Sequence, residues 1–171
     1  MLVRDAVAAD LERVSETKVA SWRDTYSPLL PAPVLAPFLD ERSQLEYIRA
    51  AYADKGTLLL VAEGAGGTGV VGFALTHVDE EPDPWLESLH VLAQHRSRGT
   101  GAALVRATAV RLRALGRHTM RLGVVAGNDR AMRFYERLGA EHIGHEPAAW
   151  ATDVRHELYR WPDISVLEEV V

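Results

Sequence analysis

The stretch LESLHVLAQHRSRGTGAALV, residues 86–105, determines the fold of this chain more than any other. A β-rich run passes into a short basic turn with two glycines, and a helical pattern follows directly. The first N–H groups of a helix lack internal partners and lie at the positive end of its dipole. Gly99 and Gly101 have no side chain to keep a pyrophosphate away, and Arg96 and Arg98 add positive charge. The stretch therefore predicts an anion-binding strand–turn–helix unit, the alternative being a glycine turn with solvated arginines.

A second informative stretch, NDRAMRFYERLGAEHIG, covers residues 128–144. Asn128 is suited to cap a helix, because its side chain can accept a hydrogen bond from an early N–H group. Ala131, Phe134, Tyr135 and Leu138 recur at helical spacing, which by itself indicates only a helix with one buried face. From this pattern alone, Tyr135 is either a core aromatic residue or a functional one.

The rest of the chain alternates between helical and β-rich patterns. Helices are predicted at about 8–26 and about 40–53, and the four prolines of Ser27–Pro37 are expected to break the chain between them. Strands are predicted at residues 2–4, 58–64, 70–78, 85–92, 118–125, 141–144 and 154–159. The order is β-α-α-β-β-β-α-β-α-β-β without a repeat or linker, so residues 1–171 are predicted to form one α/β domain with a mixed sheet.

Composition narrows the classes of function. The 19 basic and 24 acidic side chains give a net charge of −5, which argues against nucleic-acid binding. No apolar run approaches the roughly 20 residues of a membrane span, and the N-terminus lacks a signal-peptide pattern, so a cytoplasmic protein without a membrane partner is expected. The absence of cysteine excludes disulfides and cysteine nucleophiles. His142 and His145 have no third ligand at a recognisable spacing, so no metal is expected.

Together, the two stretches resemble a known family. Arg-x-x-Gly-x-Gly after Leu-x-Val, followed by Asn-x-x-Ala-x-x-Phe-Tyr-Glu-x-x-Gly, is similar to the motifs of the GCN5-related N-acetyltransferase (GNAT) superfamily. The resemblance covers about residues 86–144, and the predicted element order agrees with that family's fold elsewhere. It implies an acyl-CoA N-acyltransferase domain with a splayed central sheet, CoA-binding motifs at about 86–144 and acceptor-side helices at about 8–53. The implied co-substrate is acetyl-CoA.

The resemblance also implies roles for individual residues. The family binds acyl-CoA between two parallel strands, which would be 85–92 and 118–125 here. The positions that fall on its CoA-binding motifs are Leu89, His90, Val91, Arg96, Ser97, Arg98, Gly99, Thr100, Gly101, Ala102 and Asn128. Tyr135 falls on the tyrosine that often protonates the leaving thiolate.

Acyl-transfer chemistry fits these roles. A neutral amine would attack the thioester carbonyl, and a departing thiolate with a pKa of about 8.5 benefits from a tyrosine donor with a pKa of about 10. A fixed N–H group, expected at Val91, would stabilise the negative charge that develops on the carbonyl oxygen. Because the chain has no cysteine to carry the acyl group, direct transfer in a ternary complex is the predicted mechanism.

The general base is harder to identify. Some relatives carry a glutamate five residues before the motif asparagine, but that position is Gly123 here. The leading candidate is Glu87, which strand alternation places on the same face as Val91. The alternative for Glu87 is a surface or salt-bridged carboxylate, and His77 and His90 are weaker candidates.

Acceptor binding is expected at the end of the first helix. Trp22 and Tyr26 lie four residues apart on one helix face, where they either stack on a substrate or cover the core. The predicted acceptor is a primary amine of a small molecule or peptide. O-acyl transfer and a non-catalytic CoA-binding sensor are the alternatives. The tail ISVLEEVV, residues 164–171, is predicted to fray or to cover the partner in a homodimer.

Overall fold

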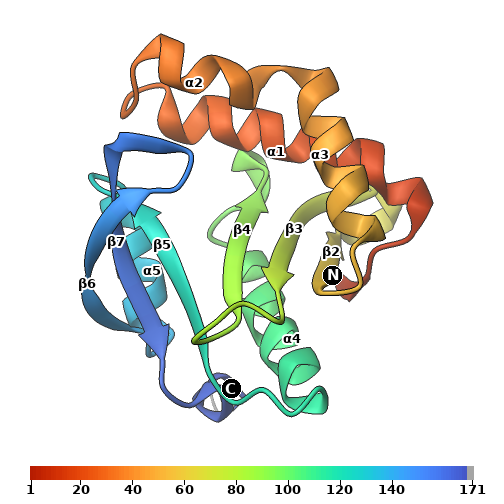
Figure 1. Cartoon of the computed structure of the whole chain (residues 1–171). Coiled ribbons are helices and arrows are strands. Elements are labelled where there is room, and N and C mark those ends of the chain that lie inside the picture. Colours follow the sequence, from red (N-terminus) through yellow and green to blue (C-terminus); the bar gives the residue numbers. More distant parts are fainter. Residues whose placement is uncertain (169–171) are drawn as a thin grey trace.

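A seven-stranded sheet runs through the molecule in the computed structural model, which describes residues 1–168 (Figure 1). Its strands, in chain order, are β1 (Leu2–Asp5), β2 (Thr57–Glu63), β3 (Val70–His77), β4 (Trp85–Val91), β5 (Met120–Val125), β6 (Glu141–Ala148) and β7 (Ala151–Trp161). Their order across the sheet is β1-β2-β3-β4-β5-β7-β6. Neighbouring strands are antiparallel except β4 and β5, which are parallel. The predicted α/β fold with a mixed sheet is confirmed.

Helices cover both faces of this sheet. They are α1 (Leu11–Tyr26), α2 (Ala32–Leu39), α3 (Glu41–Ala53), α4 (Thr100–Ala114) and α5 (Asp129–Arg137). Helices α1 and α3 pack on one face of β2 and β3, whereas α4 packs on the opposite face. Figure 1 shows α1 and α2 lying across the upper ends of β4 and β5. None of the helices in the described part of the chain is both long and apolar enough to cross a membrane.

Helix α2 corrects the expectation that the prolines of Ser27–Pro37 only interrupt the chain. They do end α1, whose C-cap is Ser27. A new helix then begins after Pro31, with Pro33 in its first turn, where a missing N–H costs no hydrogen bond. Pro37 lies inside α2, and its carbonyl accepts a hydrogen bond of 2.9 Å from the Gln44 side chain of α3. The segment from Leu11 to Ala53 therefore forms three helices, whereas the sequence predicts two.

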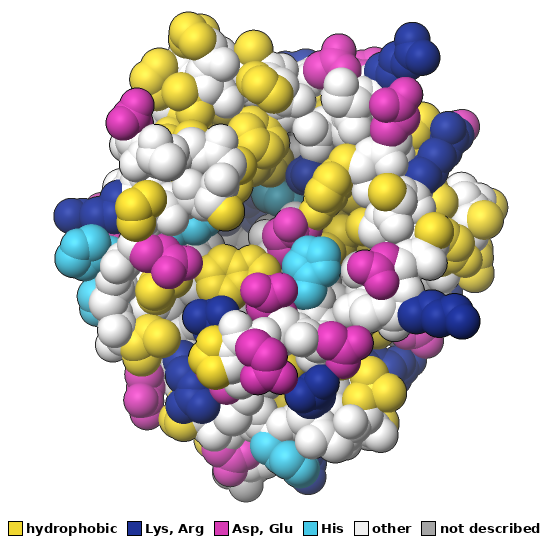
Figure 2. Space-filling view, viewed as in Figure 1, with side chains coloured by type: hydrophobic (Ala, Val, Ile, Leu, Met, Phe, Trp, Pro, Cys, Tyr) yellow, Lys and Arg dark blue, Asp and Glu magenta, His cyan; other side chains and the backbone are white. Residues whose placement is uncertain are grey.

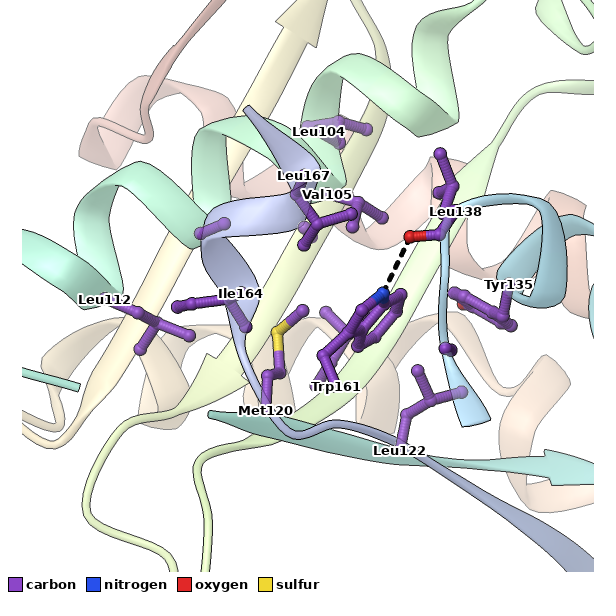
Figure 3. Packing of buried hydrophobic residues seen from close by; sticks show 14 of the residues in the cluster. Leu104, Val105, Leu112, Met120, Leu122, Tyr135, Leu138, Trp161, Ile164 and Leu167 are labelled. Atoms are coloured by element: carbon purple, nitrogen blue, oxygen red, sulfur yellow. Dashed lines mark hydrogen bonds between the residues drawn. The ribbon is translucent and has the colours of Figure 1, made fainter. Parts of the chain in front are cut away.

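The larger hydrophobic core lies between α4, α5 and the sheet (Figure 3). Trp161 is fully buried at its centre and donates a hydrogen bond of 2.9 Å from Nε1 to the Leu138 carbonyl. The short helical turn Ile164–Leu167 closes the core, because Ile164 and Leu167 are both fully buried. The expectation of a frayed tail is therefore wrong for this segment. Residues 169–171 lie outside the described residues, and the homodimer stays a prediction.

Strands β4 and β5 touch at one end and separate toward the other. Their register contains the single pair Trp85 with Arg121, and Figure 1 shows the strands diverging from there. Asp83, 4% exposed, lies just before β4 and accepts two hydrogen bonds, of 2.8 and 3.0 Å, from Arg160 on β7. The Arg121 N–H donates to the Pro84 carbonyl at 2.9 Å. These contacts hold the closed end of the opening.

We expect Asp83→Asn to lower the free energy of unfolding by about 2 kcal/mol, because it breaks a pair whose carboxylate is buried while Arg160 is partly exposed. Asp79→Asn is the matched control, since the Asp79–Arg117 pair is exposed and should contribute less than about 1 kcal/mol. Urea denaturation at pH 7 measures both changes. Equal losses in the two variants would contradict the proposed contribution of the buried pair.

The same pair predicts a pH dependence of stability. The Arg160 guanidinium holds the pKa of Asp83 below its ordinary value. The stabilisation is therefore complete above the unfolded-state pKa of about 3.9 and is lost as the pH falls through the lower folded-state pKa. Denaturation curves of the wild type and Asp83→Asn should converge below pH 4, and a constant difference down to pH 2 would contradict this.

Candidate active site

A cavity of about 1190 Å³ lies where β4 and β5 separate, below α1 and α2. Figure 2 shows a hollow at the centre of this face, with apolar, acidic and histidine side chains around it. Most residues that the sequence assigned to the site line this cavity: Trp22, Tyr26, Glu87, Leu89, His90, Val91, Arg96, Ser97, Gly99, Gly101, Ala102, Asn128 and Tyr135. Arg98 and Thr100 are not among the lining residues.

The edge of β4 that faces the opening carries free backbone groups. The Leu92 N–H donates to the Val71 carbonyl on β3 at 3.0 Å. Because backbone groups alternate in direction along a strand, those of Val91 and Leu89 point away from β3, toward the opening. The backbone of His90 faces β3 instead, which corrects its expected place among the CoA-facing backbone groups. The Val91 N–H is thus available to a carbonyl oxygen in the opening.

The turn before α4 presents a helix N-terminus to the same cavity. Gly99 caps the helix with φ of 82°, a conformation that glycine adopts without strain, and open space surrounds the position of its missing Cβ. Thr100 is buried, and Arg98 is exposed. On α5, the Arg130 guanidinium donates to the Ser97 hydroxyl at 3.2 Å. Arg130 was not predicted as a site residue, although it lies in the first turn of α5.

Arg96 has a different role from the one implied by the resemblance. Its Nε donates to the Val91 carbonyl at 2.9 Å, and its guanidinium pairs with Asp24 on α1. Ser21 and Thr25, also on α1, accept longer hydrogen bonds from it. Arg96 therefore ties the end of β4 to α1 rather than projecting freely toward an anion.

Asn128, Tyr26 and Tyr135 meet at the open end of β5. The Asn128 side chain caps α5 by accepting a hydrogen bond of 3.2 Å from the Ala131 N–H, as predicted, and it also hydrogen-bonds Tyr26. Burial raises the pKa of Tyr26 to about 12. Burial likewise raises the pKa of Tyr135, which is 8% exposed. Both hydroxyls consequently keep their protons at neutral pH, and Tyr135 can act as a proton donor.

A β-bulge changes the direction of Glu87. Leu75 pairs with Ser88 and Thr76 pairs with Leu86, so Glu87 has no partner on β3. Val91 packs against the core on the α4 side, whereas Glu87 contacts side chains on the α1 and α3 side. The expectation that strand alternation puts Glu87 on the face of Val91 is therefore wrong, because the extra residue reverses the alternation.

Three side chains surround the Glu87 carboxylate. It accepts a short hydrogen bond from the Tyr47 hydroxyl of α3 and lies 3.4 Å from His77 Nε2. Burial acts to raise the pKa of Glu87, but the hydrogen bonds to His77 and Tyr47, with the nearby charge of Lys18, hold it below its ordinary value. The hydrogen bond to Glu87 raises the pKa of His77. The lowered pKa keeps the carboxylate ionised at neutral pH. Because 33% of the Glu87 side chain is exposed, the carboxylate is also accessible from the cavity.

Two further histidines line the cavity. His90 Nδ1 lies 3.0 Å from the Ser21 hydroxyl, and burial lowers the pKa of His90 to about 3, which keeps the ring neutral. His156 of β7 lies over Gly123, where an added Cβ would be 2.6 Å from His156 Nδ1. Burial lowers the pKa of His156 as well. The ring thus fills the place of the side chain that Gly123 lacks, a tertiary contact without a sequence signal.

Trp22 belongs to an aromatic cluster at the α1–α2 corner. It stacks on Phe38 with a centroid distance of 4.0 Å and meets Trp150 edge-on at 5.5 Å. The ring centroid of Tyr26 lies 4.5 Å from that of Trp22. Because Trp22 is only 7% exposed, it mainly fills the core, and the cluster forms an apolar wall of the cavity.

His142 and His145 are the histidines that the sequence raises as possible metal ligands. His142 pairs with Glu157 at 2.8 Å on the outer strands. Within residues 1–168, the histidine and acidic side chains form no group of three or more that could hold a metal ion.

Known proteins are similar to this chain in sequence. Residues 19–140 match the model of the acetyltransferase (GNAT) family. An L-methionine sulfoximine/L-methionine sulfone acetyltransferase of Pseudomonas paraeruginosa is 31% identical over 123 residues, which cover 69% of this chain and 67% of that protein. An uncharacterised N-acetyltransferase of Bacillus subtilis is 25% identical over 171 residues, covering 99% of this chain and 97% of the relative.

A solved structure has the same fold. PaiA N-acetyltransferase of Thermoplasma acidophilum, in complex with coenzyme A, superimposes with a TM-score of 0.75 at 18% identity. The superposition covers 93% of this chain and 96% of that one.

The two arginines of the turn should differ in their contribution to stability. We expect Arg96→Met to lower the free energy of unfolding by about 1–2 kcal/mol, because the Val91 carbonyl and Asp24 lose their partner. Arg98→Met, at an exposed position two residues away, should change it by less than about 0.5 kcal/mol. Urea denaturation measures the free energy of unfolding of both variants. Equal stabilities would show that Arg96 does not tie α1 to β4.

Proposed function

The chain belongs to the acetyltransferase (GNAT) family, and on this premise we propose that it is an enzyme that transfers the acetyl group of acetyl-CoA to a primary amine. The acceptor is a small molecule or a peptide, and the amine attacks directly in a ternary complex. The observation that carries this function is the single cavity that brings together the free Val91 N–H, the buried Tyr135 hydroxyl and the Glu87 carboxylate. The described chain acts as one domain.

The opening between β4 and β5 suits the CoA part of the substrate. The backbone groups of Leu89, which point away from β3, can hydrogen-bond a pantetheine amide, which a closed sheet could not do. At the turn, the open space at Gly99 lets a pyrophosphate approach the first N–H groups of α4. Arg98 and Arg130 supply positive charge beside it, since neither is buried.

The proposed reaction needs three groups of this chain. Glu87, directly or through water, takes a proton from the acceptor ammonium, and the amine nitrogen attacks the acetyl carbonyl. The Val91 N–H stabilises the negative charge on the carbonyl oxygen. When the C–S bond breaks and the C–N bond remains, the nitrogen loses its second excess proton to water, and the Tyr135 hydroxyl donates its proton to the leaving thiolate and regains one from water. The residues thus bind, orient and move protons, and no acyl group is carried on the protein.

A turnover assay tests this function. Purified protein is incubated with acetyl-CoA and a panel of primary amines, and free CoA thiol and the acetylated amine are both measured. We expect stoichiometric release of thiol and amide with at least one amine. Tight CoA binding with no transfer to any amine would instead indicate the non-catalytic sensor, and transfer only to alcohols would indicate O-acyl transfer.

Tyr135→Phe should lower kcat by about 100-fold or more, because the thiolate then leaves without a proton donor. The KM for acetyl-CoA should stay within about threefold of the wild-type value, since the ring still packs in place. Tyr52→Phe is the control, because Tyr52 is exposed on α3. An unchanged kcat in Tyr135→Phe would remove Tyr135 from the mechanism.

Glu87→Gln should reduce kcat/KM by about 100-fold, because the amide cannot accept the amine proton. Glu80→Gln is the matched control, since Glu80 also lines the cavity but is exposed. His156→Gln is measured in parallel, because His156 is another base that lines the cavity and burial lowers its pKa. A large loss in His156→Gln with none in Glu87→Gln would transfer the role of base to His156.

A further inference from the structure

Lys18 is a charged group of the cavity that the proposed reaction leaves without a role. It lies on α1, is 6% exposed, and lines the cavity. Its Nζ lies 4.1 Å above the centroid of the Tyr47 ring, and its ammonium makes no ion pair or hydrogen bond within the described part of the chain. The chain carries only two lysines among its 19 basic residues, and the other, Lys55, is exposed.

A buried ammonium is expensive unless something compensates its charge. Burial lowers the pKa of Lys18 to about 8, and the nearby Glu87 opposes this change. Lys18 therefore remains mainly cationic at neutral pH. A leucine or methionine at this position would pack against Tyr47 without the cost of desolvation. A lysine at this position is explained if a ligand supplies a negative charge that compensates the Lys18 ammonium.

Tyr47 contacts both Lys18 and Glu87. Its ring face lies under the Lys18 ammonium, while its hydroxyl donates to the Glu87 carboxylate. Glu87 completes its contacts with His77 rather than with Lys18. Two opposite charges consequently border the same cavity, close enough to affect each other but without a direct ion pair among the described residues, which is the arrangement that a zwitterion would complement.

We infer that Lys18 binds a carboxylate of the acceptor, and that the acceptor is therefore an α-amino acid or a similar molecule with a carboxylate next to its amine. This inference rests on the proposed acetyl transfer and specifies its substrate. The ammonium of the acceptor faces Glu87, which takes its proton, while the carboxylate stays paired with Lys18. Lys18 thus fixes the orientation of the amine toward the opening between β4 and β5.

The aromatic wall indicates the side chain of this acceptor. Trp22 follows Lys18 by one turn of α1, a rise of about 6 Å that a single amino acid can span. Trp22, Phe38 and Trp150 pack against one another, so they present one apolar surface rather than a slot between rings. An apolar or aromatic side chain lying on this wall leaves the two charged groups of the amino acid to Lys18 and Glu87.

Matched probes test the inference with the wild-type protein. L-phenylalanine is compared with L-phenylalaninamide and 2-phenylethylamine, and L-leucine with L-leucinamide and 3-methylbutylamine. We expect kcat/KM to be at least about 10-fold higher for each acid than for its amide, as for a hydrogen bond to a charged group. An equal or higher value for the amides and simple amines would overturn the assignment.

Lys18→Met isolates the residue, with Lys55→Met as the matched control. For the two amino acids, we expect Lys18→Met to raise KM by about 10- to 100-fold with a smaller change in kcat. For the amides and simple amines, both variants should stay within about threefold of the wild type. An equal loss for acids and simple amines in Lys18→Met would show that Lys18 only supports the charge of Glu87, which would also overturn the proposal.

The outcomes separate this inference from the proposed function. If no amine of either kind gives acetylated product, acetyl transfer itself fails. If simple amines are acetylated and amino acids are not preferred, only the role of Lys18 fails. Should Lys18→Met not fold, Lys18→Gln replaces it, and the comparison of acids with amides in the wild type still decides.

Discussion

The contact between the start of β4 and its neighbours β5 and β7 is the constraint on which the site depends. Asp83, which is buried, and Arg160, which is partly exposed, form a bidentate pair there, beside the single β4–β5 register pair. A sheet whose two central strands are fastened at one end and unpaired at the other leaves backbone donors without partners. Such donors are costly in a core, but in a cavity they are ready for a substrate. The opening between β4 and β5 is thus a consequence of incomplete strand pairing.

Helix α1 connects the two sides of this opening. Its cavity-facing side carries Lys18 at one end and Tyr26 at the other. Arg96 fastens the helix to the end of β4, and Tyr26 reaches Asn128 at the end of β5. One rigid element therefore aligns the proposed acceptor-binding charge with the groups that act on the thioester. A change in α1 is expected to affect acceptor binding and catalysis together.

The sequence predicted those parts of the site whose function comes from local backbone geometry. The Gly99 turn and the Asn128 cap depend on residues within a few positions, so their motifs could be recognised and their positions were confirmed. Side-chain directions were harder to predict. The bulge at Glu87 reverses its face, and Arg96 turns to α1, because each depends on a partner far along the chain.

Sequence alone was sufficient for the family, the order of the strands along the chain, the glycine turn before α4 and most of the proposed site residues that line the cavity. Only the tertiary structure decided which charges face one another. Tyr47 contacts both Lys18 and Glu87, and His156 occupies the space above Gly123, through contacts between elements that no local pattern records. The physical reason is the distance along the chain between the interacting residues. Backbone conformation is set mainly by sequence neighbours, whereas the electrostatic environment of a side chain is set by every residue that packs near it.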